Sequence, residues 1–123
     1  MGAGVTLELP WPPTANLIWR HVRGATYSSA KYQQFTAMVF LLVRQQLPRR
    51  FVRYCWPIRV EIDLYPPTRQ KSDIDNRIKP TLDALTRAGV WEDDSLVAEL
   101  RVRRMKVVKN GKAVVRIEEV CNE

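Results

Sequence analysis

The chain has 123 residues, 46% of them hydrophobic, which is enough for one domain with a modest core over residues 1–123. Twenty Lys and Arg against 13 Asp and Glu give a formal net charge of +7. This charge favours a nucleic-acid partner, although solubility alone could account for part of it. The longest apolar stretch, Ala37–Val43, is too short to span a bilayer, and no signal-peptide pattern opens the chain. We therefore expect a cytoplasmic protein that does not enter membranes.

The first predicted element is a half-buried strand at Val5–Leu9, where apolar and polar residues alternate before Pro10. Residues 14–29 are then predicted to form a loop in which basic and aromatic residues are interleaved. Such a loop suits phosphate contacts and base stacking, and an ordinary surface loop is the alternative. Its candidate DNA contacts are Asn16, Arg20, His21 and Arg23.

A helix is predicted next, because apolar residues recur at helical spacing from Phe35 to Val43. The stripe continues to Gln46, and the helix should end near Leu47-Pro48. Phe40 and Leu41 fall outside the stripe and widen the apolar surface. Core burial and a dimer contact are both open for these two residues.

The clearest strand pattern follows this helix, with apolar and charged residues alternating. One face carries Trp56, Ile58, Val60, Ile62 and Leu64, and the other carries Arg59, Glu61 and Asp63. A second helix is predicted from the spacing of Ile74, Ile78, Leu82 and Leu85. Gly89 is its expected C′ residue, and Pro80 predicts an irregular first turn.

Two strands, 96–108 and 112–120, are predicted to pair as a hairpin around Asn110-Gly111. Both turn residues tolerate the positive φ of a type I′ turn. If Asn110 and Gly111 are the two loop residues, Arg103 lies opposite Glu118, and a bulge is expected near Arg103-Arg104. The basic residues can form a solvated edge or a DNA-facing ribbon, two interpretations that are compatible, and Arg103 is a candidate DNA contact. The expected fold class is α+β, one domain with a mixed sheet and two main helices in the order β-α-β-α-β-β.

The acidic residues gather in two segments, Ser72–Pro80 and Trp91–Ser95. Asp73 and Asp75 should point to the same side, because side chains alternate along an extended chain. Asp93-Asp94 can join them only if the chain returns to the same end of the second helix. Such oxygen ligands suit a hard divalent cation, and in a cationic protein this suggests phosphodiester chemistry.

Simpler structural roles are open for several of these carboxylates. An Asp-x-Asp pair alone can also be a helix cap or an exposed turn. Asp83 is most simply an i,i+4 partner of Lys79 or Arg87.

The segment Asp73–Asp94 resembles the RusA family of Holliday junction resolvases, found largely in phages and prophages. The resemblance is carried by Asp-Ile-Asp-Asn, Lys79 and the Gly-Val-Trp-Glu-Asp-Asp turn, and also by Leu9–Pro13, Asn16 and Arg20-His21. With the C-terminal strands it covers nearly the whole chain. One departure is Thr68-Arg69-Gln70-Lys71-Ser72, where family members can carry an almost unbroken arginine run.

The resemblance implies a RusA-like fold and a homodimeric, structure-selective endodeoxyribonuclease. It would resolve four-way DNA junctions by paired symmetric nicks in recombination and repair, leaving 5′-phosphate and 3′-hydroxyl ends. It implies Mg²⁺, replaceable by Mn²⁺, bound by Asp73, Asp75 and Asp94, with Asp93 as a further candidate ligand. Lys79 would be catalytic. Further candidate DNA contacts are Arg69, Lys71 and Asn76.

Two other functions are open. The chain could be a metal-free basic protein that only binds nucleic acid, or a Mg²⁺ nuclease of the same fold acting on flaps or forks.

Overall fold

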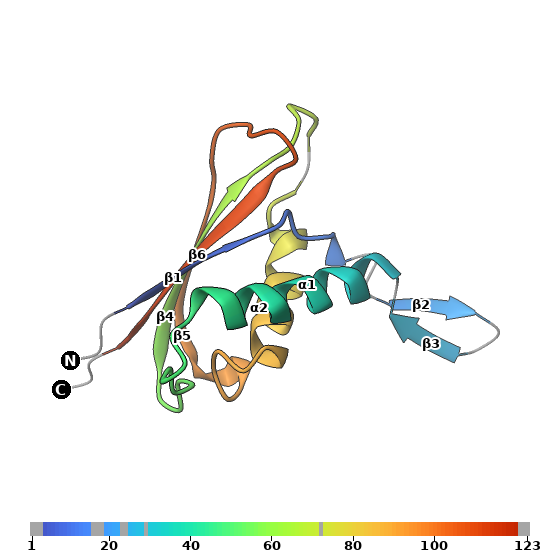
Figure 1. Cartoon of the computed structure of the whole chain (residues 1–123). Coiled ribbons are helices and arrows are strands. Elements are labelled where there is room, and N and C mark those ends of the chain that lie inside the picture. The colour runs from blue at the N-terminus through green and yellow to red at the C-terminus, as the bar shows by residue number, and fades with distance from the viewer. Residues whose placement is uncertain (1–3, 16–18, 23–24, 29, 72, 121–123) are drawn as a thin grey trace.

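The computed structural model describes residues 4–15, 19–22, 25–28, 30–71 and 73–120. It confirms the expected α+β class: a mixed four-stranded sheet with two helices, and a separate two-stranded hairpin (Figure 1). The strands are β1 (Val5–Leu9), β2 (Trp19–Val22), β3 (Ala25–Ser28), β4 (Ile58–Tyr65), β5 (Val97–Arg104) and β6 (Lys112–Glu119). The helices are α1 (Ala30–Gln46) and α2 (Ile78–Arg87), with 3₁₀ turns η2 (Asp75–Arg77) and η3 (Asp94–Leu96). No helix in the described part is long and apolar enough to cross a membrane.

β4 is the central strand of the sheet, whose order is β1-β6-β4-β5. It pairs in parallel with β5 and antiparallel with β6, so Ile62 lies between Val102 and Val115. The predicted inner face is confirmed for Ile58, Val60, Ile62 and Leu64, each at most 1% exposed. Trp56 was wrongly placed on this face: it precedes β4 and is 48% exposed. Pro57 lacks an N–H for the ladder, and the strand begins only after it.

The predicted hairpin between the last two strands is wrong. β5 and β6 do not pair, because β4 lies between them; Arg103 is opposite Asp63, and Glu118 is opposite Arg59. The turn itself exists, with φ values of 68° at Asn110 and 67° at Gly111. The turn joins β5 to β6, which lie on either side of β4 and are not paired with each other. The register shift of β5 falls opposite Ile58/Arg59, at the start of the strand and not near Arg103.

α1 confirms the predicted amphipathic helix and packs its buried face against the sheet and α2. Its buried residues are Tyr32, Phe35, Val39 and Val43. Phe40 and Leu41 stay 42% and 58% exposed, so the chain's own core does not bury them. Gln46 ends the helix beside β1, where its amide donates to Glu8 O and accepts from Glu8 N, both at 2.8 Å.

The start of α2 shows the irregular turn that Pro80 predicted. The 3₁₀ turn η2 precedes the helix, and Pro80 is its third residue, where the helix needs no N–H from it. At the other end Gly89 has φ 83°. Gly89 N donates to Thr86 O at 3.0 Å and Val90 N to Leu85 O at 3.1 Å, which is a Schellman motif.

The predicted loop at residues 14–29 is wrong at 19–22 and 25–28, which form strands. β2 and β3 form an antiparallel hairpin in which Arg20 lies opposite Tyr27 and His21 opposite Thr26. In Figure 1 this hairpin projects from the body beside the first turn of α1. The two-residue spacer Arg23-Gly24 is a hairpin signal that the interleaved charges obscured.

Replacing Gly89 with Ala should lower the free energy of unfolding by about 1 kcal/mol. No atom lies within 4 Å of an added Cβ, so the cost comes from the positive φ alone. Gly89→Asn is the matched control and should lose less, since Asn tolerates this conformation better. Urea unfolding of the three proteins measures the order; equal losses for Ala and Asn would contradict it.

Candidate active site

Asp73, Asp75 and Lys79 lie together at the beginning of α2. Asp73 precedes η2 and Asp75 opens it, and both side chains are exposed. Neither carboxylate makes a hydrogen bond or ion pair with another described residue. Lys79 is the second residue of α2 with a 64% exposed side chain, and its Nζ lies 3.5 Å from Asp83 Oδ2. The predicted i,i+4 partnership of Asp83 with Lys79 is confirmed.

Arg77 fastens this acidic turn to the proline-rich segment after β1. Its guanidinium lies 4.6 Å from the ring centroid of Trp11, and its Nη1 donates to Pro12 O. Burial lowers the pKa of Arg77 by removing the charge from water. Its Nε is buried without a hydrogen-bond partner in the described chain. Sequence reasoning missed this residue, although an Arg inside the acidic motif and a Trp between prolines were visible signals.

Asp93 and Asp94 lie at the opposite end of α2. Asp94 Oδ1 accepts from Trp91 Nε1 at 3.1 Å and contacts the Thr86 hydroxyl, and Trp91 itself is only 1% exposed. Asp93 caps η3 by accepting from Ser95 N at 3.0 Å and from the Ser95 hydroxyl. These hydrogen bonds hold the pKa of Asp93 below its ordinary value.

A single chain therefore does not assemble the predicted ligand set. α2 has ten residues, which span about 15 Å at 1.5 Å per residue. Asp73 follows the end of β4, whereas Asp94 precedes β5, whose first residue lies opposite the first residue of β4. The return to the same helix end that the prediction required does not occur. Among the described residues, no three His, Cys, Asp or Glu side chains are close enough to hold a metal ion.

The candidate DNA contacts are distributed over several elements. Arg69 and Lys71 are exposed in the segment between β4 and the acidic turn, and Asn76 is half-buried in η2. Arg20 and His21 lie on β2. Asn16 and Arg23 lie outside the described residues.

Arg103, the remaining candidate, is engaged with a buried acid on the sheet face opposite the helices. Its guanidinium donates to both oxygens of Asp63 at 2.9 and 3.0 Å, and Arg116 donates to Asp63 Oδ2 at 2.8 Å. Asp63 is only 3% exposed. Burial alone would raise the pKa of Asp63, but the bonds from the two arginines outweigh it and hold that pKa below its ordinary value.

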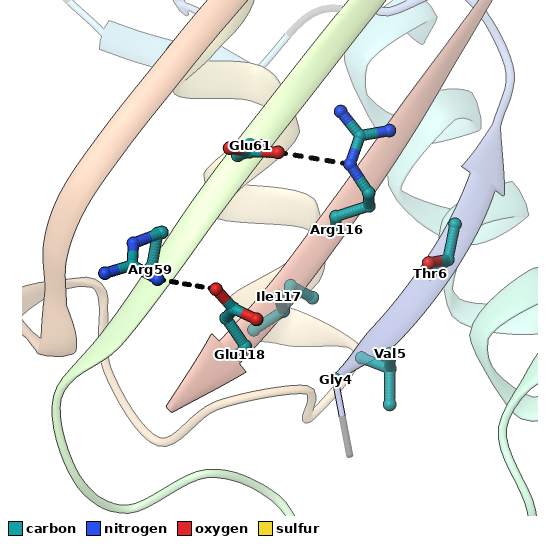
Figure 2. Close-up of a pocket in the computed structure, with 8 residues that line it drawn as sticks. All are labelled: Gly4, Val5, Thr6, Arg59, Glu61, Arg116, Ile117 and Glu118. Atoms are coloured by element: carbon teal, nitrogen blue, oxygen red, sulfur yellow. Dashed lines mark hydrogen bonds and ion pairs between the residues drawn. The ribbon is translucent and has the colours of Figure 1, made fainter. Parts of the chain in front are cut away.

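The same face continues as a set of ion pairs around a depression of about 220 Å³. Figure 2 shows Glu61 directed toward Arg116, and Arg59 toward Glu118, from neighbouring strands. Arg101 is also paired, 4.0 Å from Glu61. Arg59, Arg101, Arg103 and Arg116 of this face are thus each paired with an acid, which fits a solvated edge; the DNA-facing ribbon stays a prediction.

Carboxylates and a lysine at one helix end of a small basic α+β protein are the kinds of group that metal-assisted chemistry on phosphodiesters uses. The family profile described as "Endodeoxyribonuclease RusA" matches residues 10–118. The chain belongs to this RusA family of endodeoxyribonucleases.

Relatives named "Crossover junction endodeoxyribonuclease RusA" align with nearly the whole chain. Those of Escherichia coli strain K12 and Shigella sonnei strain Ss046 are each 36% identical over 118 residues, covering 96% of this chain and 97% of the relative. The protein of that name from Enterobacteria phage 82 is 37% identical over 117 residues, covering 95% and 96%. The match includes both acidic segments and Lys79.

Replacing Asp63 with Asn should lower the free energy of unfolding at neutral pH by about 2 kcal/mol, because two arginines lose their charged acceptor. The folded pKa of Asp63 lies below the unfolded value of about 4. Its stabilisation is therefore complete above about pH 4 and is lost as the pH falls through the folded pKa.

Denaturant unfolding of wild type and Asp63→Asn from pH 7 to pH 2.5 measures the difference between their free energies of unfolding. This difference should become smaller as the pH falls. Glu99→Gln is the matched control, since Glu99 pairs with Arg59 at an exposed site and should cost less than about 1 kcal/mol. A difference between wild type and Asp63→Asn that does not depend on pH would contradict the assignment.

Proposed function

We propose that this chain is a metal-dependent, structure-selective endodeoxyribonuclease that resolves four-way DNA junctions during recombination and repair. The observation that carries the proposal is the family match over residues 10–118, which includes both acidic segments and Lys79. The names of the relatives specify crossover junctions as their substrate. The net charge of +7 supports a polyanionic partner.

The proposed cation is Mg²⁺, replaceable by Mn²⁺, with Asp73, Asp75 and Asp94 as ligands and Asp93 as a further candidate. Exposed aspartates at the start of α2 that have no partner among the described residues suit a hard cation that also keeps bound water. In one chain only Asp73 and Asp75 of this set lie together, because Asp94 lies beyond the other end of α2. When bound, the ion would supply Lewis-acid chemistry at the scissile phosphate.

Lys79 is proposed to act directly on the phosphate. Its ammonium is exposed and stands one helical turn beyond Asp75, where it can stabilise charge on phosphoryl oxygens. Asp83 Oδ2, 3.5 Å from Lys79 Nζ, limits the positions that the lysine takes. Arg69 and Lys71 precede the same turn and would hold the DNA backbone beside it.

The assembly is proposed to be a homodimer in the cytoplasm. A four-way junction needs two symmetric cuts, and two identical sites related by a two-fold axis would provide them.

Asp73→Asn, Asp75→Asn and Asp94→Asn should each abolish cleavage of a labelled four-way junction in Mg²⁺. Junction binding without metal should be unchanged or tighter, since a carboxylate that repels phosphates has been removed. Glu92→Gln is the matched control: this exposed acid lies on the same turn as Asp94, pairs with Arg53, and should leave cleavage intact.

Three outcomes separate the alternatives. Wild-type protein that binds junctions but never cleaves DNA, with Mg²⁺ or Mn²⁺, would support the binding-only function. Faster cleavage of flaps or forks than of junctions would assign a different substrate. A variant that cleaves normally removes its residue from the ligand set.

Lys79→Ala should reduce the single-turnover cleavage rate about a hundredfold, the effect of removing a cation of about 3 kcal/mol from a developing charge. Junction affinity should change little. Lys71→Ala should instead lower affinity and reduce the salt slope of binding by about one. Cleavage rates at saturating enzyme and affinities across a salt series distinguish a catalytic lysine from a phosphate contact. An unchanged cleavage rate for Lys79→Ala would contradict the catalytic role of Lys79.

A further inference from the structure

A hollow of about 500 Å³ lies between the proline-rich segment after β1, residues 10–14, and the first turns of α1 (Figure 1). We call it the α1 hollow. Its volume falls in the range of sites that hold small ligands, about 300–1,000 Å³. Arg77, the last residue of η2, lines one side of it. The α1 hollow therefore borders the same turn that carries Asp75.

The walls of the α1 hollow combine apolar surface with a few polar groups. Trp11 and Phe35 contribute aromatic rings, and Met38, 48% exposed, adds a flexible apolar side chain. Lys31 and Gln34 are exposed on α1, and neither makes a hydrogen bond or ion pair with another described residue. No acidic side chain is found among the described residues that line the hollow. The lining suits a ligand with a flat apolar part, a hydrogen-bonding edge and a negative charge.

A nucleotide has all three of these properties. Its base can stack on the indole of Trp11, and base–aromatic stacking accepts every base. The amide of Gln34 offers both a donor and an acceptor to the edge of a base, and the ammonium of Lys31 suits a phosphate. Inorganic phosphate would leave the aromatic surface unused, and an apolar molecule would leave Lys31 and Gln34 unused.

Basic residues flank this surface on both sides. The guanidinium of Arg77 lies 4.6 Å from the ring centroid of Trp11, and the two side chains also line a second hollow of about 170 Å³, together with Lys71. On the other side, the β2–β3 hairpin with Arg20 lies beside the first turn of α1. A DNA strand that crosses from the hairpin to Lys71 would pass over the α1 hollow.

We propose that the α1 hollow is a nucleobase pocket, which takes one unstacked nucleotide from the branch point of the DNA substrate. The inference rests on the proposed function and adds a way of selecting the substrate. A base inside a continuous duplex must be unpaired and unstacked before it can enter, whereas a base at a branch enters at a smaller cost. An occupied pocket would hold the strand against Arg77, between Asp75 and Lys79 in the sequence.

Photocross-linking tests the pocket without requiring cleavage. 5-Iodouracil, which bonds to an adjacent aromatic side chain on irradiation, replaces one base at a time on either side of the crossing point of a four-way junction. Each junction is irradiated with the protein in the absence of metal, and the modified residue is mapped by mass spectrometry. We expect modification of Trp11 by the junctions and not by duplexes with the same substitutions. Cross-links that lie only outside the α1 hollow would overturn the proposal.

Irradiation with 5-iodo-2′-deoxyuridine monophosphate separates a DNA base from a free nucleotide. The monophosphate should modify Trp11 weakly or not at all, because it lacks the neighbouring strand contacts. If it modifies Trp11 and the junctions do not, the hollow serves a free nucleotide and the proposal is wrong.

A substitution measures the contact with the base. Gln34→Ala should weaken metal-free binding of the junction about fivefold and leave duplex binding unchanged, since one hydrogen bond to the base is lost. On a junction with an abasic site at the cross-linked nucleotide, the variant and wild type should bind equally, because the group that Gln34 contacts is absent. Gln45→Ala is the matched control, an exposed glutamine of α1 outside the hollow, and should bind every substrate like wild type. No loss on the intact junction, or the same loss on both junctions, would contradict the pocket.

The pocket and the proposed function can fail separately. If wild type cleaves junctions but none of them modifies Trp11, the pocket is wrong and the proposed function stands. Modification of Trp11 in a protein that never cleaves DNA would support the pocket and reject the nuclease function.

Discussion

The parallel pairing of β4 with β5 is the constraint on which the structure depends. Two parallel strands cannot be joined by a tight turn, so the chain must travel back along the sheet before β5 begins. α2 makes this return and covers part of the apolar face on the way. The acidic turn before the helix and the acidic turn after it are therefore fixed at opposite ends. The same crossover that completes the core separates Asp73 and Asp75 from Asp94.

The two faces of the sheet are stabilised by different interactions. The face under the helices is closely packed and apolar, and it gives the domain its stability. The other face has no helix over it and is covered by its own arginines and acids. Asp63 is buried there beneath two guanidinium groups instead of beneath apolar side chains. The buried Asp63 carboxylate is stable only while both arginines stay bonded to it. These bonds connect Asp63 of β4 to Arg103 of β5 and Arg116 of β6.

Local patterns in the sequence predicted most individual elements. Alternation located β1, β4 and β6, helical spacing located α1, and Gly89 marked the end of α2. The pairing of strands could not be read in the same way. Asn110-Gly111 carried a true turn signal, but no local pattern shows that β4, about forty residues earlier, enters between the strands it joins. The site was predicted from its residue types, whereas the separation of Asp94 from Asp73 depends on that topology.

The amide of Gln46 has a consequence for how copies of this protein can associate. β1 is an outer strand, and a free backbone edge invites another strand to add to the sheet. Gln46 makes at Glu8 the same two backbone contacts that such a strand would make. At the opposite border, β5 carries charged side chains, among them Arg101, Arg103 and Arg104, and charged residues on an edge strand disfavour the addition of another strand. Both borders thus resist the addition of further strands, which is the route to open-ended fibrils.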